Sequence, residues 1–293
     1  MTDARLNRAR RSLEGLATGD GFGERFFGPL PSERIATRTL SPGPWRVTDD
    51  TMMALSLVEV LATHGAVAGD LEQDALAAAF GRRYLAEPGR GYGPAAHGYL
   101  PRLARGEDWR VVAREPFGGT GSMGNGSAMR VAPLGAFFAD EAPARIAAEA
   151  AASAAPTHAH PEGAAGAVAI ALAAAWRAAP GGRDLFELVL EHTPGSETWQ
   201  GIVRAARLGP VSVETAVAAL GNGSRVICPD TVPFALWCVS RFPDDYEEAL
   251  WLTVSGLGDR DTTCAIVGGV LASGEGIAPP AEWVARRERL EGL

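Results

Sequence analysis

Apolar residues recur at helical spacing along almost the whole chain, and runs that alternate polar and apolar residues are nearly missing. In the stretch ARLNRARRSLEGLATGDG, for example, Leu6, Ala9, Leu13 and Leu16 share one helical face, and the glycines that follow predict a helix stop. A weak strand candidate is WRVVA at Trp109–Ala113. The pattern predicts an all-α protein.

The remaining helices are expected where the same spacing continues between Gly- and Pro-containing loops. No linker or charge block divides residues 1–293, so roughly a dozen helices are expected in a single compact domain. After the first helix, these are predicted at Thr51–Thr63, Asp70–Leu85, Pro94–Arg105, Ala142–Ala154, Gly163–Ala178, Leu185–His192, Thr198–Leu208, Ser212–Leu220, Pro229–Ser240, Asp245–Ser255 and Thr262–Ser273.

Composition excludes several classes of protein. The 27 basic residues other than histidine are all arginine, which removes Schiff-base, pyridoxal-phosphate and P-loop lysines. The net charge of −8 argues against nucleic-acid binding. The longest apolar run, Gly163–Trp176, is shorter than the ~20 residues of a membrane span, and the start of the chain is charged, so a cytoplasmic protein is expected. Cys228, Cys238 and Cys264 are expected to be reduced core residues.

Two acidic stretches each open an apolar helix. The first is TDDT, with Asp49 and Asp50, and the second is GDRDTT, with Asp259 and Asp261. Helix capping alone would explain such residues, because side-chain oxygens satisfy free backbone N–H groups. If the two helix starts meet, however, charges ~4 Å apart repel by about 4 kcal/mol at an effective dielectric of about 20. Cations would then be needed, and oxygen ligands favour Mg²⁺.

The stretch PFGGTGSMGNGSAMRVAPLG contains a literal G-x-G-x-x-G motif. A Rossmann fingerprint needs a preceding strand, and this chain is helical, so dinucleotide binding of that kind is not favoured. Glycines with Ser122 and Asn125 still expose backbone N–H groups before a helix, which suits a phosphate or diphosphate. A flexible connector is the alternative interpretation.

A histidine pair, His158 and His160, lies in THAHPEG just before the Ala-rich helix. A His-x-His pair could bind zinc, but no third His or Cys ligand is near in sequence. Pro161 and Glu162 mark a helix start. His158 could contact a ligand, and the alternative is that both histidines are solvated loop residues.

Taken together, these stretches resemble the ADP-ribosylglycohydrolase family. The similarity runs from GLATGDGFGE through TDDT, GSMGNGSAMR and THAHPEG to GDRDTTCAIVGGVLAS. The resemblance implies an all-α, orthogonal helical bundle with two Mg²⁺, or Mn²⁺ in some members, in a dinuclear metal cleft. It also implies an enzyme that hydrolyses the glycosidic bond between ADP-ribose and an acceptor. The metal ligands implied are Thr48, Asp49, Asp50, Asp259, Asp261 and Thr262.

The same resemblance places ADP-ribose on the glycine loop and beside the metals, and the protein is expected to be a monomer. Candidates for the proton-transferring base are Asp50, Asp261 and Glu24. The substrate-binding residues implied are Phe117, as an adenine-stacking ring, together with Gly119, Gly121, Ser122, Gly124, Asn125, Gly126 and His158.

Two positions depart from the family pattern. Members that cleave serine-linked ADP-ribose carry a flap glutamate where this chain has Phe27, and the nearest acid is Glu24, one turn earlier. Arg260 fills a motif position where small residues are usual, and it could face solvent or a substrate anion. The alternatives left open are hydrolysis of O-acetyl-ADP-ribose or a nucleotide phosphate ester, and a non-catalytic ADP-ribose-binding protein.

Overall fold

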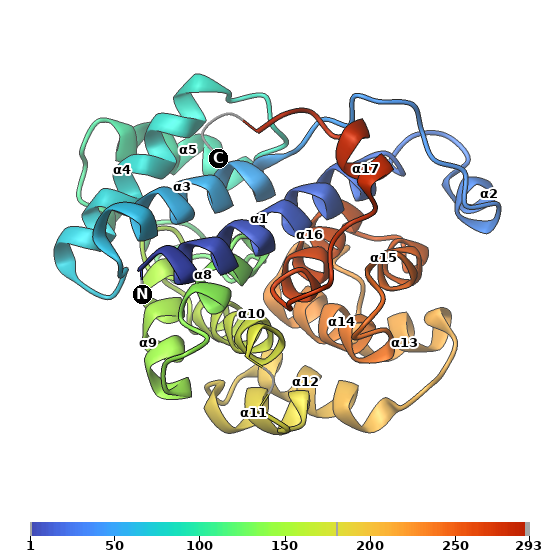
Figure 1. Ribbon diagram of the computed structural model, residues 1–293. Helices are drawn as coiled ribbons and strands as arrows, with labels where there is room; N and C mark the ends of the chain where they lie inside the picture. Colours follow the sequence, from blue (N-terminus) through green and yellow to red (C-terminus); the bar gives the residue numbers. More distant parts are fainter. Residues whose placement is uncertain (1, 180, 291–293) are drawn as a thin grey trace.

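Helices make up the regular structure of residues 2–179 and 181–290, which are the residues that the computed structural model describes (Figure 1). No strand occurs in this part of the chain; two isolated bridges join Trp45 to Arg287 and Gly124 to Ile227. The predicted all-α class is therefore confirmed. The helices are α1 (Thr2–Glu24), α2 (Pro31–Ala36), α3 (Asp49–His64), α4 (Asp70–Ala86), α5 (Pro94–Ala104), α6 (Trp109–Val112), α7 (Gly126–Met129), α8 (Ala132–Phe137), α9 (Pro143–Ala154), α10 (Pro161–Ala178), α11 (Leu185–His192), α12 (Glu197–Leu208), α13 (Val213–Leu220), α14 (Cys228–Arg241), α15 (Tyr246–Ser255), α16 (Arg260–Leu271) and α17 (Ala281–Arg286).

Helices α1 and α16 lie against each other at the centre of the molecule (Figure 1). Three glycines at four-residue spacing on α1 make this close approach possible. A Cβ on Gly15, Gly19 or Gly23 would lie 2.4, 2.2 or 2.2 Å from a backbone oxygen of α16. The predicted helix stop at the glycines after Leu16 was wrong: α1 continues to Glu24, because packing against α16 offsets the low helix propensity of glycine.

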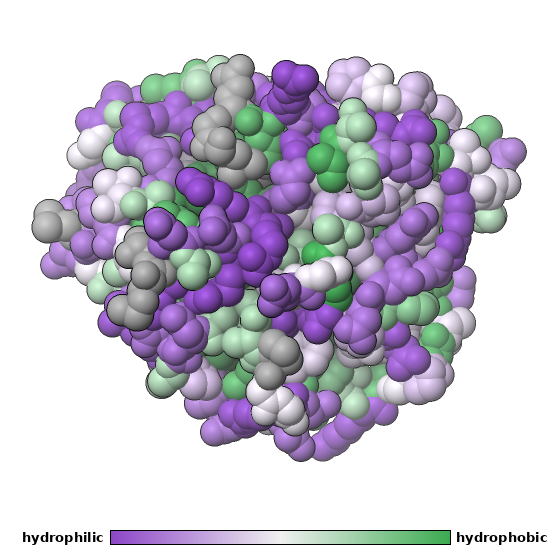
Figure 2. Space-filling view, in the orientation of Figure 1, coloured by the Kyte–Doolittle hydropathy of each residue, from purple (hydrophilic) through white to green (hydrophobic). Residues whose placement is uncertain are grey.

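Helix α10 is the Ala-rich helix that the sequence predicted, and most of its residues are buried. It lies beside α8, α9 and α14, so apolar side chains surround it on several sides. No described helix is long and apolar enough to cross a membrane. The three cysteines are free and buried, as expected. The face in Figure 2 is mainly hydrophilic, with small separate apolar patches.

The predicted strand at Trp109–Ala113 is instead the short helix α6, which Asp108 caps by accepting from the Arg110 N–H at 2.9 Å. An isolated β-branched pair without a neighbouring strand has no ladder to join, so the cap decides the local structure. Periodicity over long windows also missed the short helices α2 and α17. The helix expected after the glycine loop is divided into α7 and α8, and the described residues thus hold more helices than the dozen expected.

Candidate active site

The N-termini of α3 and α16 meet, as the two acidic stretches predicted. Thr262 of α16 donates its hydroxyl to Oδ2 of Asp50 at 3.4 Å. The hydroxyl oxygen of Thr48, directly before α3, lies 3.0 Å from the same oxygen and caps the helix by accepting from the Asp50 N–H. The capping interpretation thus holds for Thr48, and the convergence of the two helix starts holds as well.

Asp20 completes this cluster, and sequence reasoning missed it. Its carboxylate is fully buried on α1 and accepts from both the N–H and the hydroxyl of Thr48 and of Thr51, at 2.5–3.3 Å. Burial nevertheless raises the pKa of Asp20 to about 6, because desolvation outweighs these hydrogen bonds. The signal was present in the GDG of the first helix, where an acid interrupts an otherwise small and apolar helix face.

The remaining aspartates of the cluster are largely buried and lie close to one another, which raises their pKa values. Burial, then the charges of Asp20 and Asp259, raise the pKa of Asp49 to about 7. Burial and neighbouring carboxylates raise the pKa of Asp50 and of Asp261 well above the usual range. Asp49, Asp259 and Asp261 are partly exposed, so the cluster can be reached from solvent. Several carboxyl groups are therefore held where they resist ionising together.

The second acidic stretch does not behave as a simple cap. Asp259 is the residue before α16, but its side chain makes no capping hydrogen bond. Asp261, two residues later, lies inside the first turn of α16 and not on an extended segment. The two carboxyls are still close enough to affect each other, because the charge of Asp259 raises the pKa of Asp261.

The donor chemistry of the cluster suits a hard cation. Oδ1 of Asp50 and Oδ1 of Asp261 are buried and have no hydrogen-bond partner, which is costly for carboxylate oxygens. In the described part of the chain, no three Asp, Glu, His or Cys side chains converge as a metal-binding group. The hydroxyls of Thr48 and Thr262 lie within 3.4 Å of Oδ2 of Asp50 and add two further oxygen atoms to the cluster.

The glycine loop lies next to the acidic cluster and is joined to it by Asn125. The Asn125 side-chain amide donates to Oδ2 of Asp259 at 2.7 Å and to the hydroxyl of Thr231 at 3.1 Å. On the other side of the loop, the Gly124 N–H donates to Oγ of Ser122 at 3.1 Å. The flexible-connector interpretation is wrong for this half of the loop, because Ser122 and Asn125 are buried.

The loop glycines divide into two groups. Gly119 and Gly121 have φ values of 92° and 76°, in the left-handed region that glycine adopts without strain. Gly124 and Gly126 instead lie against the imidazole of His158, where an added Cβ would be 3.0–3.4 Å from ring atoms. The structure thus brings the predicted residues 121–126 and His158 together.

The two histidines have different surroundings. His158 is buried, so the solvated-loop alternative is wrong for it, and burial together with the charge of Arg130 lowers its pKa well below the usual range. His160 precedes α10 and its Nδ1 accepts from the Glu162 N–H at 3.1 Å. Since His160 caps a helix and His158 faces the glycine loop, the pair does not form a zinc site.

The remaining predicted residues make no hydrogen bond to the cluster aspartates in the described part of the chain. Phe117 is 66% exposed and is free to contact a ligand ring. Burial raises the pKa of Glu24, Arg25 and Arg46 lower it, and none of the cluster aspartates contributes. The guanidinium of Arg260 packs against the segment that follows α1. It donates to the backbone oxygen of Phe26 and lies 4.5 Å from the centre of the Phe27 ring.

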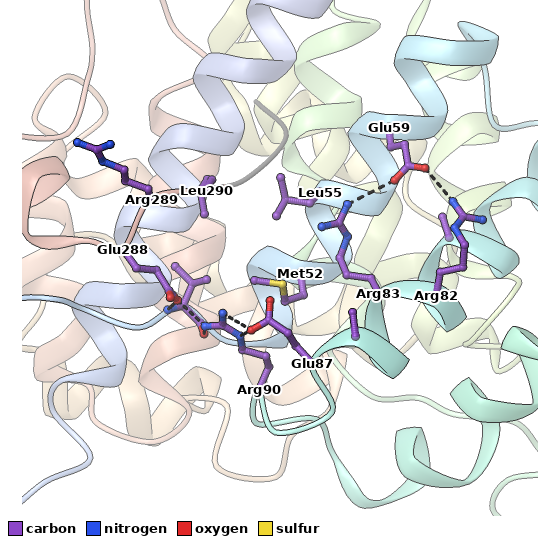
Figure 3. A pocket seen from close by; sticks show the side chains of 13 residues that line it. Met52, Leu55, Glu59, Arg82, Arg83, Glu87, Arg90, Glu288, Arg289 and Leu290 are labelled. Carbon is purple, nitrogen blue, oxygen red and sulfur yellow. Dashed lines mark hydrogen bonds and ion pairs between the residues drawn. The ribbon is translucent and has the colours of Figure 1, made fainter.

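The C-terminal segment forms hydrogen bonds with the backbone directly before α3. Glu288 accepts from the Val47 N–H at 2.7 Å and pairs with Arg90, which also contacts Glu87 (Figure 3). The backbone oxygen of Arg90 in turn accepts from the Asp49 N–H at 2.8 Å. These residues border a polar cavity of about 480 Å³ between α3 and α4. We call Glu288 and Arg90 the brace, because together they hold the backbone of the first acidic stretch in place.

Fold and site together define a class of all-α proteins in which aspartates from facing helix N-termini adjoin a glycine-rich loop. Comparison with known proteins narrows the class. The family model for ADP-ribosylglycohydrolase matches residues 1–293, and the chain belongs to this family. The resemblance seen in the sequence is confirmed.

Relatives and solved structures agree over nearly the full length. ADP-ribosylhydrolase ARH3 from Bos taurus is 30% identical, covering 95% of this chain and 88% of that protein. An uncharacterized protein from Archaeoglobus fulgidus is 32% identical, covering 97% and 90% of the two chains. A solved structure titled ADP-ribosylglycohydrolase-related protein complex aligns with a TM-score of 0.67 at 26% identity, covering 98% and 94%.

Proposed function

We propose that this protein is a divalent-cation-dependent hydrolase, with two Mg²⁺ or Mn²⁺ in the acidic cluster, that cleaves ADP-ribose from an acceptor. The observation that carries the proposal is the 2.7 Å hydrogen bond from Asn125 to Asp259. It joins the glycine loop to the carboxylates, so a diphosphate on the loop would bring the attached ribose to the acidic cluster. Family membership supports the same activity. We also propose that residues 1–293 form a single domain.

The residues divide the work. Backbone N–H groups of the glycine loop, Ser122 and His158 would bind the diphosphate, and Phe117 would stack on adenine. Thr48, Asp49, Asp50, Asp259, Asp261 and Thr262 would hold the cations. A bound divalent cation supplies a Lewis acid that polarises oxygen atoms of water and of the ribose.

Hydrolysis needs a proton acceptor in this site. A water oxygen bonds to the anomeric carbon while the bond from that carbon to the acceptor breaks, one proton leaves the water, and one reaches the leaving group. Asp50 and Asp261 suit the accepting role, because burial raises the pKa of both carboxyls and so makes them stronger bases. Glu24 is the weaker candidate, because the charges of Arg25 and Arg46 oppose the effect of burial on its pKa.

The test is a panel of arginine-linked, serine-linked and O-acetyl-linked ADP-ribose, with Mg²⁺ or with chelator. We expect release of ADP-ribose from at least one linkage only with Mg²⁺, and a fall of about 10²–10³-fold in turnover for Asp261→Asn. Affinity for free ADP-ribose should change little, because the glycine loop is intact. Glu24→Gln should have a smaller effect than Asp261→Asn.

The matched control is Asp3→Asn, which changes an exposed aspartate on α1 and should leave turnover unchanged. Tight binding of ADP-ribose without release from any linkage would show a binding protein and contradict the hydrolase proposal. A Glu24→Gln enzyme as inactive as Asp261→Asn would instead identify Glu24 as the base.

A further inference from the structure

Arg130, in the short turn after α7, is a buried cation whose hydrogen-bond partners are all uncharged. Its side chain is fully buried, and Nη2 donates to the Ser153 backbone oxygen at 2.9 Å and to the Thr157 hydroxyl at 2.8 Å. Its guanidinium also lies 4.3 Å from the ring of Phe80. Burying a charge is costly, so a position of this kind calls for an explanation beyond packing.

The contact to Thr157 decides what the threonine hydroxyl can do. Arginine is a donor only, so the Thr157 oxygen must be the acceptor in that hydrogen bond. The one hydroxyl proton then has two neighbours: Nδ1 of His158 at 2.7 Å and the backbone oxygen of Ala154 at 3.3 Å.

Geometry favours His158 as the acceptor. The Ala154 oxygen already accepts from the backbone N–H groups of Thr157 at 3.1 Å and of His158 at 2.9 Å, which occupies both of its lone pairs. The Thr157 hydroxyl therefore donates to Nδ1 of His158 over the shorter distance. A neutral imidazole that accepts at Nδ1 carries its proton on Nε2.

The second ring nitrogen faces the glycine loop. An added Cβ would lie 3.1 Å from Nε2 at Gly126 and 3.4 Å at Gly124, beside the hydroxyl of Ser122. An Nε2–H group here donates toward an anion in the loop, whereas a bare Nε2 lone pair would repel phosphate oxygens.

We propose that Arg130 is a positioning residue that acts through Thr157 to hold His158 as the Nε2–H tautomer, so that the ring donates to a diphosphate oxygen in the glycine loop. The identity of the anion rests on the proposed function, but the tautomer does not. Arg130 acts twice, because its charge also lowers the pKa of His158 and keeps the ring neutral.

The tautomer is measured directly by long-range ¹H–¹⁵N spectra of ligand-free protein. The chain has five histidines, and the signal lost in His158→Gln identifies His158. We expect Nε2–H in the wild type, loss of that preference in Thr157→Val, and its retention in Thr157→Ser. Ser153→Ala is the matched control, because its hydroxyl bonds to the Ala150 backbone oxygen.

Calorimetric titration with free ADP-ribose provides the second readout. Thr157→Val should bind about tenfold more weakly, because a hydrogen bond to a charged oxygen is lost, and Thr157→Ser should bind nearly as the wild type does. In the His158→Gln background, Thr157→Val should cause no further loss, since both changes remove the same donor.

Two results would overturn the proposal: an Nδ1–H tautomer in the wild type, or an unchanged Nε2–H tautomer in folded Thr157→Val. Arg130→Met should also lose the preference where it folds, and Thr157→Val keeps the test decisive where it does not. Absence of ADP-ribose binding in the wild type would refute the diphosphate contact and the proposed function, while an Nε2–H signal would still support the tautomer assignment.

Discussion

Gly121 and Gly124 are three residues apart in one loop, yet an added Cβ would meet different neighbours. At Gly121 it would lie 2.8–3.0 Å from Ala159 and the His160 backbone, and φ is 76°, so this glycine is required for folding. At Gly124 it would meet only the Ser122 hydroxyl at 3.0 Å, the His158 ring at 3.4 Å and one carbonyl at 3.6 Å. We infer that Gly124 is needed for the ligand.

Gly124→Ala should therefore fold normally and bind free ADP-ribose about tenfold more weakly. The added methyl group would lie between Ser122 and His158, in the space where a charged diphosphate oxygen would accept hydrogen bonds. Loss of one such bond corresponds to about tenfold in affinity. Calorimetry measures the affinity, with Gly28→Ala as the control, because a Cβ at Gly28 meets nothing within 4 Å. Wild-type affinity in Gly124→Ala would remove this part of the loop from the binding site.

The sequence predicted residues that belong to motifs and missed those that act through tertiary contacts. Asp49, Asp50, Asp259 and Asp261 stand in two short acidic stretches, and the structure brings them together. Asp20 has no adjacent acidic residue in the sequence. It was missed because its four hydrogen-bond donors belong to Thr48 and Thr51, which lie 28 and 31 positions later in the chain.

Helix α1 shows where element-level prediction failed. Its glycines read locally as a stop, because glycine costs about 1 kcal/mol relative to alanine inside a helix. Only the partner helix reveals their purpose, and that partner lies some 250 residues later in the chain. The long periodic helices were predicted with small shifts at their ends. The short helices α2 and α17 carry too little periodicity to be found, and the helix expected after the glycine loop is divided into α7 and α8.

Gly19→Ala should destabilise the protein by about 1–3 kcal/mol, because its Cβ would lie 2.2 Å from the Cys264 backbone oxygen and push α1 from α16. The free energy of unfolding in urea measures this effect. Gly98 supplies the contrast: it is an exposed glycine within α5 with nothing within 4 Å of a Cβ. Gly98→Ala should stabilise by about 0.5–1 kcal/mol. Equal destabilisation of the two variants would mean that close packing is not what Gly19 provides.

On the scale of the whole molecule, the site is assembled from both ends of the chain. Asp20 comes from α1, the two acidic stretches open α3 and α16, and Glu288 near the C-terminus supports the backbone before α3. Periodicity cannot reveal such long-range contacts, because it reports one segment at a time. Family resemblance supplied the order of the motifs, and the structure supplied Asp20, Arg130 and the brace.

The most direct test of the account is calorimetric titration of Mg²⁺ into chelator-treated protein at pH 8. The account predicts binding to the wild type and none to Asp50→Asn/Asp261→Asn, because these carboxylates are the proposed ligands. Binding should weaken at pH 5.5, since the pKa of Asp49 is raised to about 7 and a ligand must lose its proton to bind a cation. Absence of Mg²⁺ binding at pH 8, or equal binding by the folded double variant, would contradict the assignment of the acidic cluster as a metal centre.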